Sequence, residues 1–196
     1  MEYPLETKIG IVGGGQLGKM MLLQARKMGF YTAVLDPTPD CPAHGLVDSQ
    51  IVADFYDEAA IRRLADETDV LTYEYEHIGV QVLLKLEAEG KKIYPTAASL
   101  KIIQDKLSQK TVMKNGGVPV PDFIEIPGLN DIYKAGKVFG YPLMLKSRTG
   151  GYDGKGNAVV NTPEEAPEAY EALGGGKLPL MAERMVDFTI DRKSVV

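Results

Sequence analysis

KIGIVGGGQLG, residues 8–18, joins a short apolar run to a cluster of glycines. The run Lys8–Val12 is typical of a buried strand, and it stops at the first glycine. Gly13, Gly15 and Gly18 have the G-x-G-x-x-G spacing, which lets a backbone approach an anionic group at the N-terminus of a helix. The stretch therefore predicts a strand, a glycine turn and a helix in succession.

Strands and helices alternate through the rest of the N-terminal half. The apolar pattern predicts strands at 31–35, 51–52, 70–72 and 92–94, and helices at 16–28, 57–66 and 80–88. Such alternation is typical of a parallel sheet with right-handed crossovers. We therefore expect a Rossmann-like α/β domain over residues 1–94.

The C-terminal half has a different pattern. Residues 95–116 are predicted to be a helical connector with one helical stretch over 97–114. After it, the pattern predicts strands at 123–126, 142–146, 158–161 and 180–183, and helices at 130–139 and 163–173. Because these strands are less uniformly apolar, we expect an antiparallel sheet with helices on one face, which makes residues 117–196 a smaller α+β lobe.

Composition excludes several classes of partner. Of the 196 residues, 44% are hydrophobic, which is ordinary for a globular protein, and the net charge of −5 argues against nucleic acid. No apolar run approaches the roughly 20 residues that span a bilayer, and residues 1–7 do not resemble a signal peptide, so no membrane partner is expected. The single cysteine, Cys41, cannot form an internal disulfide, so we expect a cytoplasmic location.

The first glycine loop, taken alone, leaves its ligand open. Asp36 ends the next predicted strand, about where a dinucleotide enzyme places its ribose-binding carboxylate, which favours an NAD-dependent oxidoreductase. Another phosphate ligand, or a purely structural turn, fits the loop as well. Glu74 and Glu76 follow the fourth predicted strand and face the same crevice. They suit a hydroxyl or an amine of a ligand, or else they form a solvated acidic loop.

A second glycine-rich loop gives the sharper signal. Lys146 ends a predicted strand, and the loop after it contains Gly150, Gly151, Gly154, Lys155 and Gly156. Cationic side chains with many free backbone N–H groups make a cradle for a polyphosphate. The loop is not a Walker A motif, because the G-x-x-x-x-G-K-[ST] pattern is absent. A plain glycine hairpin would have no need of the strand-end lysine.

Four segments together resemble the N5-carboxyaminoimidazole ribonucleotide synthetase family of ATP-grasp ligases: 13–20, 73–78, 104–110 and 146–157. The resemblance implies a Rossmann-like pre-ATP-grasp domain followed by the small lobe of an ATP-grasp domain. It also implies that a large C-terminal lobe of the family lies outside this sequence. We therefore expect an incomplete chain that is inactive by itself. The resemblance also implies that complete family members are homodimers.

The family's reaction belongs to de novo purine biosynthesis. The resemblance implies that ATP and bicarbonate form carboxyphosphate, whose carboxyl group is captured by the amine of 5-aminoimidazole ribonucleotide. It implies magnesium as a cofactor, with its ligands in the missing lobe and none in this chain.

The resemblance also implies roles for particular residues. ATP contacts are implied for Lys106, Lys146, Gly151, Tyr152, Asp153, Gly154, Lys155, Gly156, Asn157, Glu183, Arg184, Met185, Val186 and Asp191. Tyr152, Asp153 and Lys155 would be catalytic, orienting the bicarbonate, the phosphoryl group or the amine. Gln16, Leu17 and Glu74 would bind the aminoimidazole ribonucleotide, with its phosphate on the first glycine loop.

Two positions depart from the family pattern. Lys155 stands where many relatives have arginine, which keeps the charge but loses the bidentate fork. Asp191 stands where the family usually has glutamate, one methylene longer. The alternatives to a synthetase are a formate-dependent glycinamide ribonucleotide transformylase, an NAD-dependent oxidoreductase and a non-catalytic ligand-binding fragment.

Overall fold

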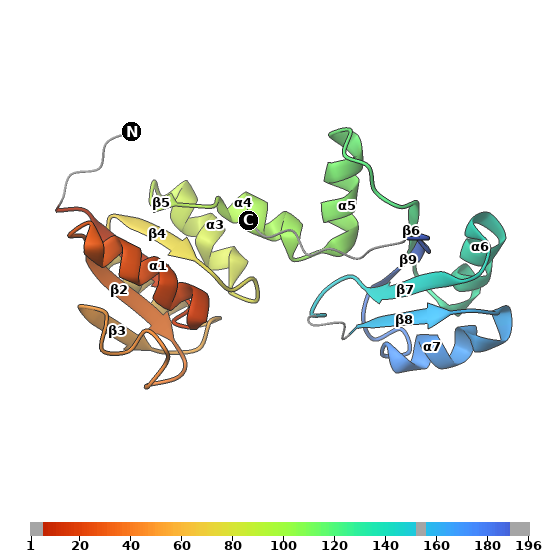
Figure 1. Cartoon of the computed structure of the whole chain (residues 1–196), viewed down its shortest axis with the longest axis horizontal. Coiled ribbons are helices and arrows are strands. Elements are labelled where there is room, and N and C mark those ends of the chain that lie inside the picture. The colour runs from red at the N-terminus through yellow and green to blue at the C-terminus, as the bar shows by residue number, and fades with distance from the viewer. Residues whose placement is uncertain (1–5, 152–155, 189–196) are drawn as a thin grey trace. The chain divides into compact units, whose positions relative to one another are not determined.

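The computed structural model describes residues 6–151 and 156–188 of the chain. These residues form two compact units, which divide between Ile103 and Gln104. Each unit has its own sheet and its own buried apolar core (Figure 1). The α/β fold class predicted from the sequence is confirmed.

The first unit contains a parallel sheet in the order β3-β2-β1-β4-β5. Its strands are β1 (Lys8–Val12), β2 (Tyr31–Asp36), β3 (Ser49–Val52), β4 (Val70–Tyr73) and β5 (Lys92–Ile93). Central β1 pairs in parallel with β2 on one side and with β4 on the other. The predicted parallel sheet is therefore confirmed.

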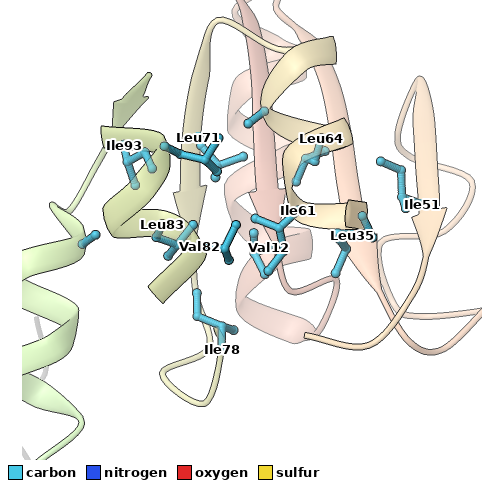
Figure 2. Close-up of a cluster of buried hydrophobic side chains, with 14 of the residues drawn as sticks. Val12, Leu35, Ile51, Ile61, Leu64, Leu71, Ile78, Val82, Leu83 and Ile93 are labelled. Atoms are coloured by element: carbon cyan, nitrogen blue, oxygen red, sulfur yellow. The ribbon is translucent and has the colours of Figure 1, made fainter. Parts of the chain in front are cut away.

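Helices cover both faces of this sheet. They are α1 (Gln16–Lys27), α2 (Glu58–Glu67), α3 (Val80–Ala88) and α4 (Ala97–Ile103). Because successive strand residues point to opposite faces, Ile11 packs with Leu22 of α1, whereas Val12 belongs to the larger core under α2 and α3. Figure 2 shows that core, with Ile61 and Leu64 of α2 and Leu83 of α3 directed at the strands.

The strand order fixes the place of the crevice in this unit. The chain runs from β1 outward to β2 and β3, and then crosses back to place β4 on the other side of β1. In open α/β sheets, ligands bind where the order reverses in this way, beyond the carboxyl ends of the strands. The loops that follow β1 and β4 meet at this point.

The second unit contains an antiparallel sheet, as predicted. Its strands lie in the order β6-β9-β7-β8. Its strands are β6 (Phe123–Ile126), β7 (Leu143–Ser147), β8 (Asn157–Val160) and β9 (Leu180–Arg184). Between β6 and β7 lies helix α6 (Leu129–Phe139). Between β8 and β9 lie the 3₁₀ turn η1 (Pro163–Glu165) and helix α7 (Ala166–Ala172). Apolar residues of α6 and α7 pack on one face of the sheet around Leu145 and Ala182.

Residues 97–114, expected to form one helical stretch, contain two helices. Helix α4 ends at Ile103, and α5 (Lys106–Asn115) begins after Asp105, whose side chain accepts hydrogen bonds from the backbone N–H groups of Leu107 and Ser108. This N-cap starts a new helix in the second unit. In the part of the chain that the structure describes, no helix is both long and apolar enough to cross a membrane.

Candidate nucleotide and substrate sites

In the second unit, Lys146 and Glu183 lie on the face of the sheet away from α6 and α7. Lys146 lies opposite Met181, and Met144 lies opposite Glu183, so these four side chains share one face. The Glu183 side chain is only 5% exposed, and its Oε2 accepts a hydrogen bond from Lys146 Nζ at 2.9 Å. Two of the predicted nucleotide contacts therefore form an ion pair diagonally across the neighbouring strands β7 and β9.

Helix α5 supplies further cations to this face. Lys106, Lys110 and Lys114 recur every fourth residue, which places them on one side of the helix. Lys110 Nζ lies 3.2 Å from Glu183 Oε1, and Lys114 Nζ lies 5.5 Å from the centre of the Phe123 ring. No residue of α5 is fully buried, so these charged contacts attach the helix to the sheet.

Lys106 reaches the end of β7. Its Nζ donates to the carbonyl of Ser147 at 3.0 Å, and its backbone N–H donates to the carbonyl of Arg148 at 2.9 Å. Burial lowers the pKa of the Lys106 ammonium, and the nearby charge of Lys146 lowers it further, while Glu183 acts in the opposite direction. The lysine is thus held close to a second cation, an arrangement that an incoming polyphosphate would relieve.

The described ends of the second glycine loop are tied to the end of β7. The backbone N–H of Ser147 donates to the carbonyl of Gly156 at 2.8 Å. Gly150 and Gly156 have φ values of 73° and 81°, which side-chain-bearing residues rarely adopt. Gly151 follows Gly150, and Asn157 begins β8 opposite Lys146. Tyr152, Asp153, Gly154 and Lys155 lie outside the described residues, as does Asp191.

The segment after β9, residues 185–188, belongs to no helix or strand. Met185 is half-buried and Val186 exposed. The guanidinium of Arg184 points away from Lys146, because its Nη1 donates to the carbonyl of Phe139 at 3.1 Å. Lys106, Lys110 and Lys146 form what we call the lysine cluster. Among residues 183–186, only the Glu183 side chain contacts it.

In the first unit, the Glu74 carboxylate lies over the glycine loop at the crevice. A Cβ added to Gly15 would come within 2.8 Å of Glu74 Oε1, and one added to Gly13 within 2.9 Å of Glu74 Cγ. Burial raises the pKa of Glu74, and the charges of Asp36 and Glu76 raise it further, while a hydrogen bond from the Gly15 backbone N–H opposes them. Because a carboxylate already occupies this end of α1, the loop favours a hydroxyl or amine donor there over a phosphate.

Asp36 ends β2, where a ribose-binding carboxylate would lie, but its side chain is buried and hydrogen-bonded to the loop backbone. The residue is 6% exposed, and its Oδ2 accepts the backbone N–H of Gly14 at 2.8 Å. Its Oδ1 accepts the backbone N–H of Thr38 at 2.8 Å. Both oxygens are thus engaged by the loop backbone, which removes the observation that supported an NAD-dependent oxidoreductase.

Gln16 and Leu17 form the exposed first turn of α1, next to the loop that Glu74 contacts. Leu17 is 58% exposed. Among residues 6–151 and 156–188, no three His, Cys, Asp or Glu side chains gather as a metal site.

Three residues in or around the lysine cluster were not predicted. Lys110 pairs with Glu183, and Arg148 pairs with Asp105 at the start of α5. The spacing of the lysines at 106, 110 and 114 is a sequence signal for the first of these contacts. The arginine–aspartate pair joins positions 43 apart, and no local pattern indicates it.

Comparison with protein families agrees with this geometry. Residues 6–104 match the ribonucleotide synthetase preATP-grasp domain, and residues 111–195 match the ATP-grasp domain. The chain belongs to the ribonucleotide synthetase pre-ATP-grasp family and continues into part of an ATP-grasp domain. Within this class, it is similar to the N-terminal part of N5-carboxyaminoimidazole ribonucleotide synthase. The family predicted from four sequence segments is confirmed.

Individual relatives show the extent of the match. The synthase of Staphylococcus aureus (strain COL) is 42% identical over 165 residues, which are 84% of this chain and 44% of the relative. The S. aureus synthetase solved with ADP has a TM-score of 0.86 at 37% identity, covering 94% of this chain and 51% of that one. The Aspergillus clavatus synthase solved with ADP and 5-aminoimidazole ribonucleotide has a TM-score of 0.81 at 34% identity, with coverages of 94% and 48%. The chain thus spans about half the length of these relatives.

Proposed function

We propose that this chain supplies the substrate-binding domain and part of the ATP-binding domain of an N5-carboxyaminoimidazole ribonucleotide synthase. The observation that carries the proposal is the convergence of Lys106, Lys146 and Glu183 on one side of the β7–β9 pair, in the unit that matches the ATP-grasp family. Support for the ligands comes from relatives solved with ADP and with 5-aminoimidazole ribonucleotide.

The proposed reaction has two steps. A bicarbonate oxygen attacks the γ-phosphorus of ATP, and the bond to ADP breaks, which gives carboxyphosphate. The exocyclic amine of 5-aminoimidazole ribonucleotide then attacks the carboxyl carbon, and the C–O bond to phosphate breaks. Inorganic phosphate and one proton leave, and N5-carboxyaminoimidazole ribonucleotide remains.

The residues of the second unit would act on the nucleotide. Lys106 and Lys146 would neutralise phosphate charge, which is the main requirement of phosphoryl transfer. Gly151, Gly156 and Asn157 would approach the phosphates through the loop backbone. The residues at 183–186 would bind the adenine, and Asp191 would make a further nucleotide contact. Tyr152, Asp153 and Lys155 remain the proposed catalytic residues of the loop.

The first unit would hold the aminoimidazole ribonucleotide. Glu74 lies at the glycine loop with its pKa raised by burial, so it can accept a hydrogen bond from a ligand hydroxyl or amine at little extra desolvation cost. Gln16 and Leu17 lie on the adjoining turn of α1. A ribonucleotide carries both kinds of donor, and this combination supports the substrate assignment.

The test joins this chain to the C-terminal half of the S. aureus relative. We expect phosphate release that requires ATP, bicarbonate and 5-aminoimidazole ribonucleotide together, and no turnover from the 196-residue chain alone. Lys146→Met should lower the rate by roughly 10²-fold or more, because charge stabilisation in the transition state is lost. Lys134→Met on α6, where the lysine pairs with nearby Asp131, is the matched control and should leave the rate unchanged.

Other substrates give the contrary outcomes. Phosphate release that requires formate and glycinamide ribonucleotide instead would replace the synthase with the transformylase. Saturable ligand binding by both units, with no turnover in the joined protein, would favour a non-catalytic binding fragment. Analysis of the products distinguishes the synthase, the transformylase and the non-catalytic fragment.

A further inference from the structure

Arg148 links the end of β7 to the start of α5. Its side chain is 18% exposed, and its guanidinium makes a bidentate contact with Asp105. Nε donates to Asp105 Oδ1 at 3.2 Å, while Nη2 donates to Oδ2. The remaining Nη1 donates to Glu125 on β6. A planar fork of this kind fixes direction as well as distance, which a lysine ammonium cannot do.

The same carboxylate organises the first turn of α5. Asp105 Oδ1 accepts the backbone N–H of Leu107 at 2.9 Å and that of Ser108 at 3.2 Å. Burial alone would raise the pKa of Asp105, but the hydrogen bonds from Arg148 and from the helix backbone outweigh it and lower the pKa. The ionised carboxylate is therefore the form that binds Arg148 and caps the first turn of α5.

Lys106 lies between the two partners of this contact. It follows Asp105 in sequence, and it donates its backbone N–H to the Arg148 carbonyl and its ammonium to the Ser147 carbonyl. Helix α5 has no fully buried residue, so apolar packing does not fix its position. Holding a long lysine side chain in one place costs conformational entropy. That cost is smaller when the backbone of Lys106 is already fixed, so an interaction other than apolar packing must fix it.

We propose that Arg148 and Asp105 form a clamp that positions the Lys106 ammonium for the polyphosphate of the nucleotide. The assignment of the ligand rests on the proposed function, whereas the clamp itself rests on the contacts around Lys106. Arg148 and Asp105 are positioning residues, since each acts on the phosphates through the lysine.

Two variants separate the clamp from simple support of the helix. Arg148→Lys keeps the positive charge but cannot make the bidentate contact. Asp105→Asn keeps a good N-cap, because asparagine caps helices as well as aspartate does, but removes the charge that the guanidinium binds. Arg62→Lys is the matched control: Arg62 makes a bidentate contact with Glu89 in the first unit and has Glu58 as a third acceptor.

The first readout is the titration of the Lys106 ammonium, followed by NMR at its Cε and Nζ and assigned with Lys106→Arg. Neighbouring charges come from Lys146 on β7, Glu183 on β9 and the clamp itself. Release of the lysine into water, away from Lys146, should move its pKa up toward the ordinary value in both clamp variants. Arg62→Lys should leave it unchanged. If the pair supports only the later turns of the helix, Lys106 keeps its place through the hydrogen bond from its backbone N–H to the Arg148 carbonyl, and this pKa should not move.

The second readout is the affinity of the 196-residue chain for ADP, measured by NMR titration. We expect the dissociation constant to rise by about tenfold in both clamp variants, the scale of one lost charge-assisted hydrogen bond. An unchanged Lys106 titration in both variants would overturn the clamp, even if they bind ADP poorly. If this chain joined to the C-terminal half of the S. aureus relative does not bind ADP, the proposed function fails and with it the clamp's ligand, while the titration still decides whether the pair positions the lysine.

Discussion

The carboxylate of Asp36 accepts the backbone N–H of Gly14 at 2.8 Å, although 22 positions separate the two residues. The contact crosses from the end of β2 to the loop after β1, and it lies in the interior. The glycine is needed for this close approach, because a Cβ at Gly14 would come within 2.5 Å of Cys41 Sγ and 3.3 Å of Asp36 Cβ. Asp36 thus shapes the loop rather than a ligand.

Asp36→Asn should therefore destabilise the first unit. The amide nitrogen cannot accept the backbone N–H that it faces, so we expect a loss of about 1–3 kcal/mol in the free energy of unfolding. Urea unfolding measures it, and the Gly14 amide should exchange with solvent faster. Asp54→Asn is the control: its Oδ1 accepts the Tyr56 N–H in an exposed turn, where asparagine serves as well, and we expect a change within about 0.5 kcal/mol.

The same finding predicts that the chain does not bind NAD. Both Asp36 oxygens already accept backbone N–H groups, so no carboxylate at this strand end is available for a ribose. Calorimetry should detect no saturable NAD binding. Tight NAD binding that Asp36→Ala abolishes would restore the oxidoreductase.

Glu74→Gln should stabilise the first unit at neutral pH. The folded state raises the pKa of this carboxyl, so near its titration the folded state binds more protons than the unfolded state. Stability is then full below the unfolded pKa and falls as pH rises through the folded pKa. Glutamine does not ionise, so Glu74→Gln avoids that loss. The gain in the free energy of unfolding should be under about 1 kcal/mol, because the Glu74 carboxylate is partly solvated.

Unfolding at several pH values between 4 and 7 measures the effect, since glutamate titrates at roughly pH 4–5. The Glu74→Gln profile should be flatter than that of the unchanged chain. Glu76→Gln removes a weaker contributor to the same shift and should change the profile less, with the same sign. Identical profiles for the unchanged chain and Glu74→Gln would contradict the raised pKa. Affinity for 5-aminoimidazole ribonucleotide should fall in Glu74→Gln if the proposed role is right.

Much of the fold could be predicted because its signals are local. The alternation of strands and helices in the first unit gave a parallel sheet, and glycines marked the turns. Strand β3 was predicted two residues too short, because Ser49 and Gln50 are polar and hide the start of the strand. The break between α4 and α5 contains no glycine or proline, and only Asp105 as an N-cap indicates it.

The site was harder to predict because its contacts are long-range. Lys146 and Glu183 were expected at the nucleotide from resemblance, yet their direct pairing follows only from the antiparallel register of β7 and β9. The Arg148–Asp105 contact depends on where α5 meets the sheet, which no local pattern specifies. The roles of Tyr152 and Lys155 stay predictions, since they lie outside the described residues.

Gly156→Ala should be more disruptive than Gly150→Ala. Both glycines have positive φ, which costs alanine about 1–2 kcal/mol. A Cβ at Gly150 meets nothing within 4 Å, whereas one at Gly156 would lie 2.4 Å from the Oγ of buried Ser147. We expect an additional loss of roughly 1 kcal/mol or more for Gly156→Ala from this overlap.

A double variant tests the cause of that difference. Ser147→Ala removes the Oγ and should recover part of the loss when combined with Gly156→Ala, but not when combined with Gly150→Ala. Chemical unfolding of the single and double variants gives the coupling energy. Equal losses for the two glycine variants, or no coupling with Ser147→Ala, would show that the overlap does not determine the loop's conformation.

Glu183→Gln should both destabilise the second unit and loosen α5. The carboxylate is 5% exposed and neutralises Lys146 on one oxygen and Lys110 on the other. Removing one member of a buried ion pair costs about 3–5 kcal/mol, and we expect roughly 2–3 kcal/mol here because both lysines retain some contact with water. Asp122→Asn, at an exposed carboxylate that pairs with Lys114 and Arg184, is the control and should change stability by under about 0.5 kcal/mol.

Hydrogen exchange adds a local readout: the amides of α5 should lose protection in Glu183→Gln, because the helix is attached through charges rather than through buried apolar residues. Full protection of α5 at unchanged stability would show that Glu183 does not hold the helix, and would leave the attachment to the Asp105 corner alone.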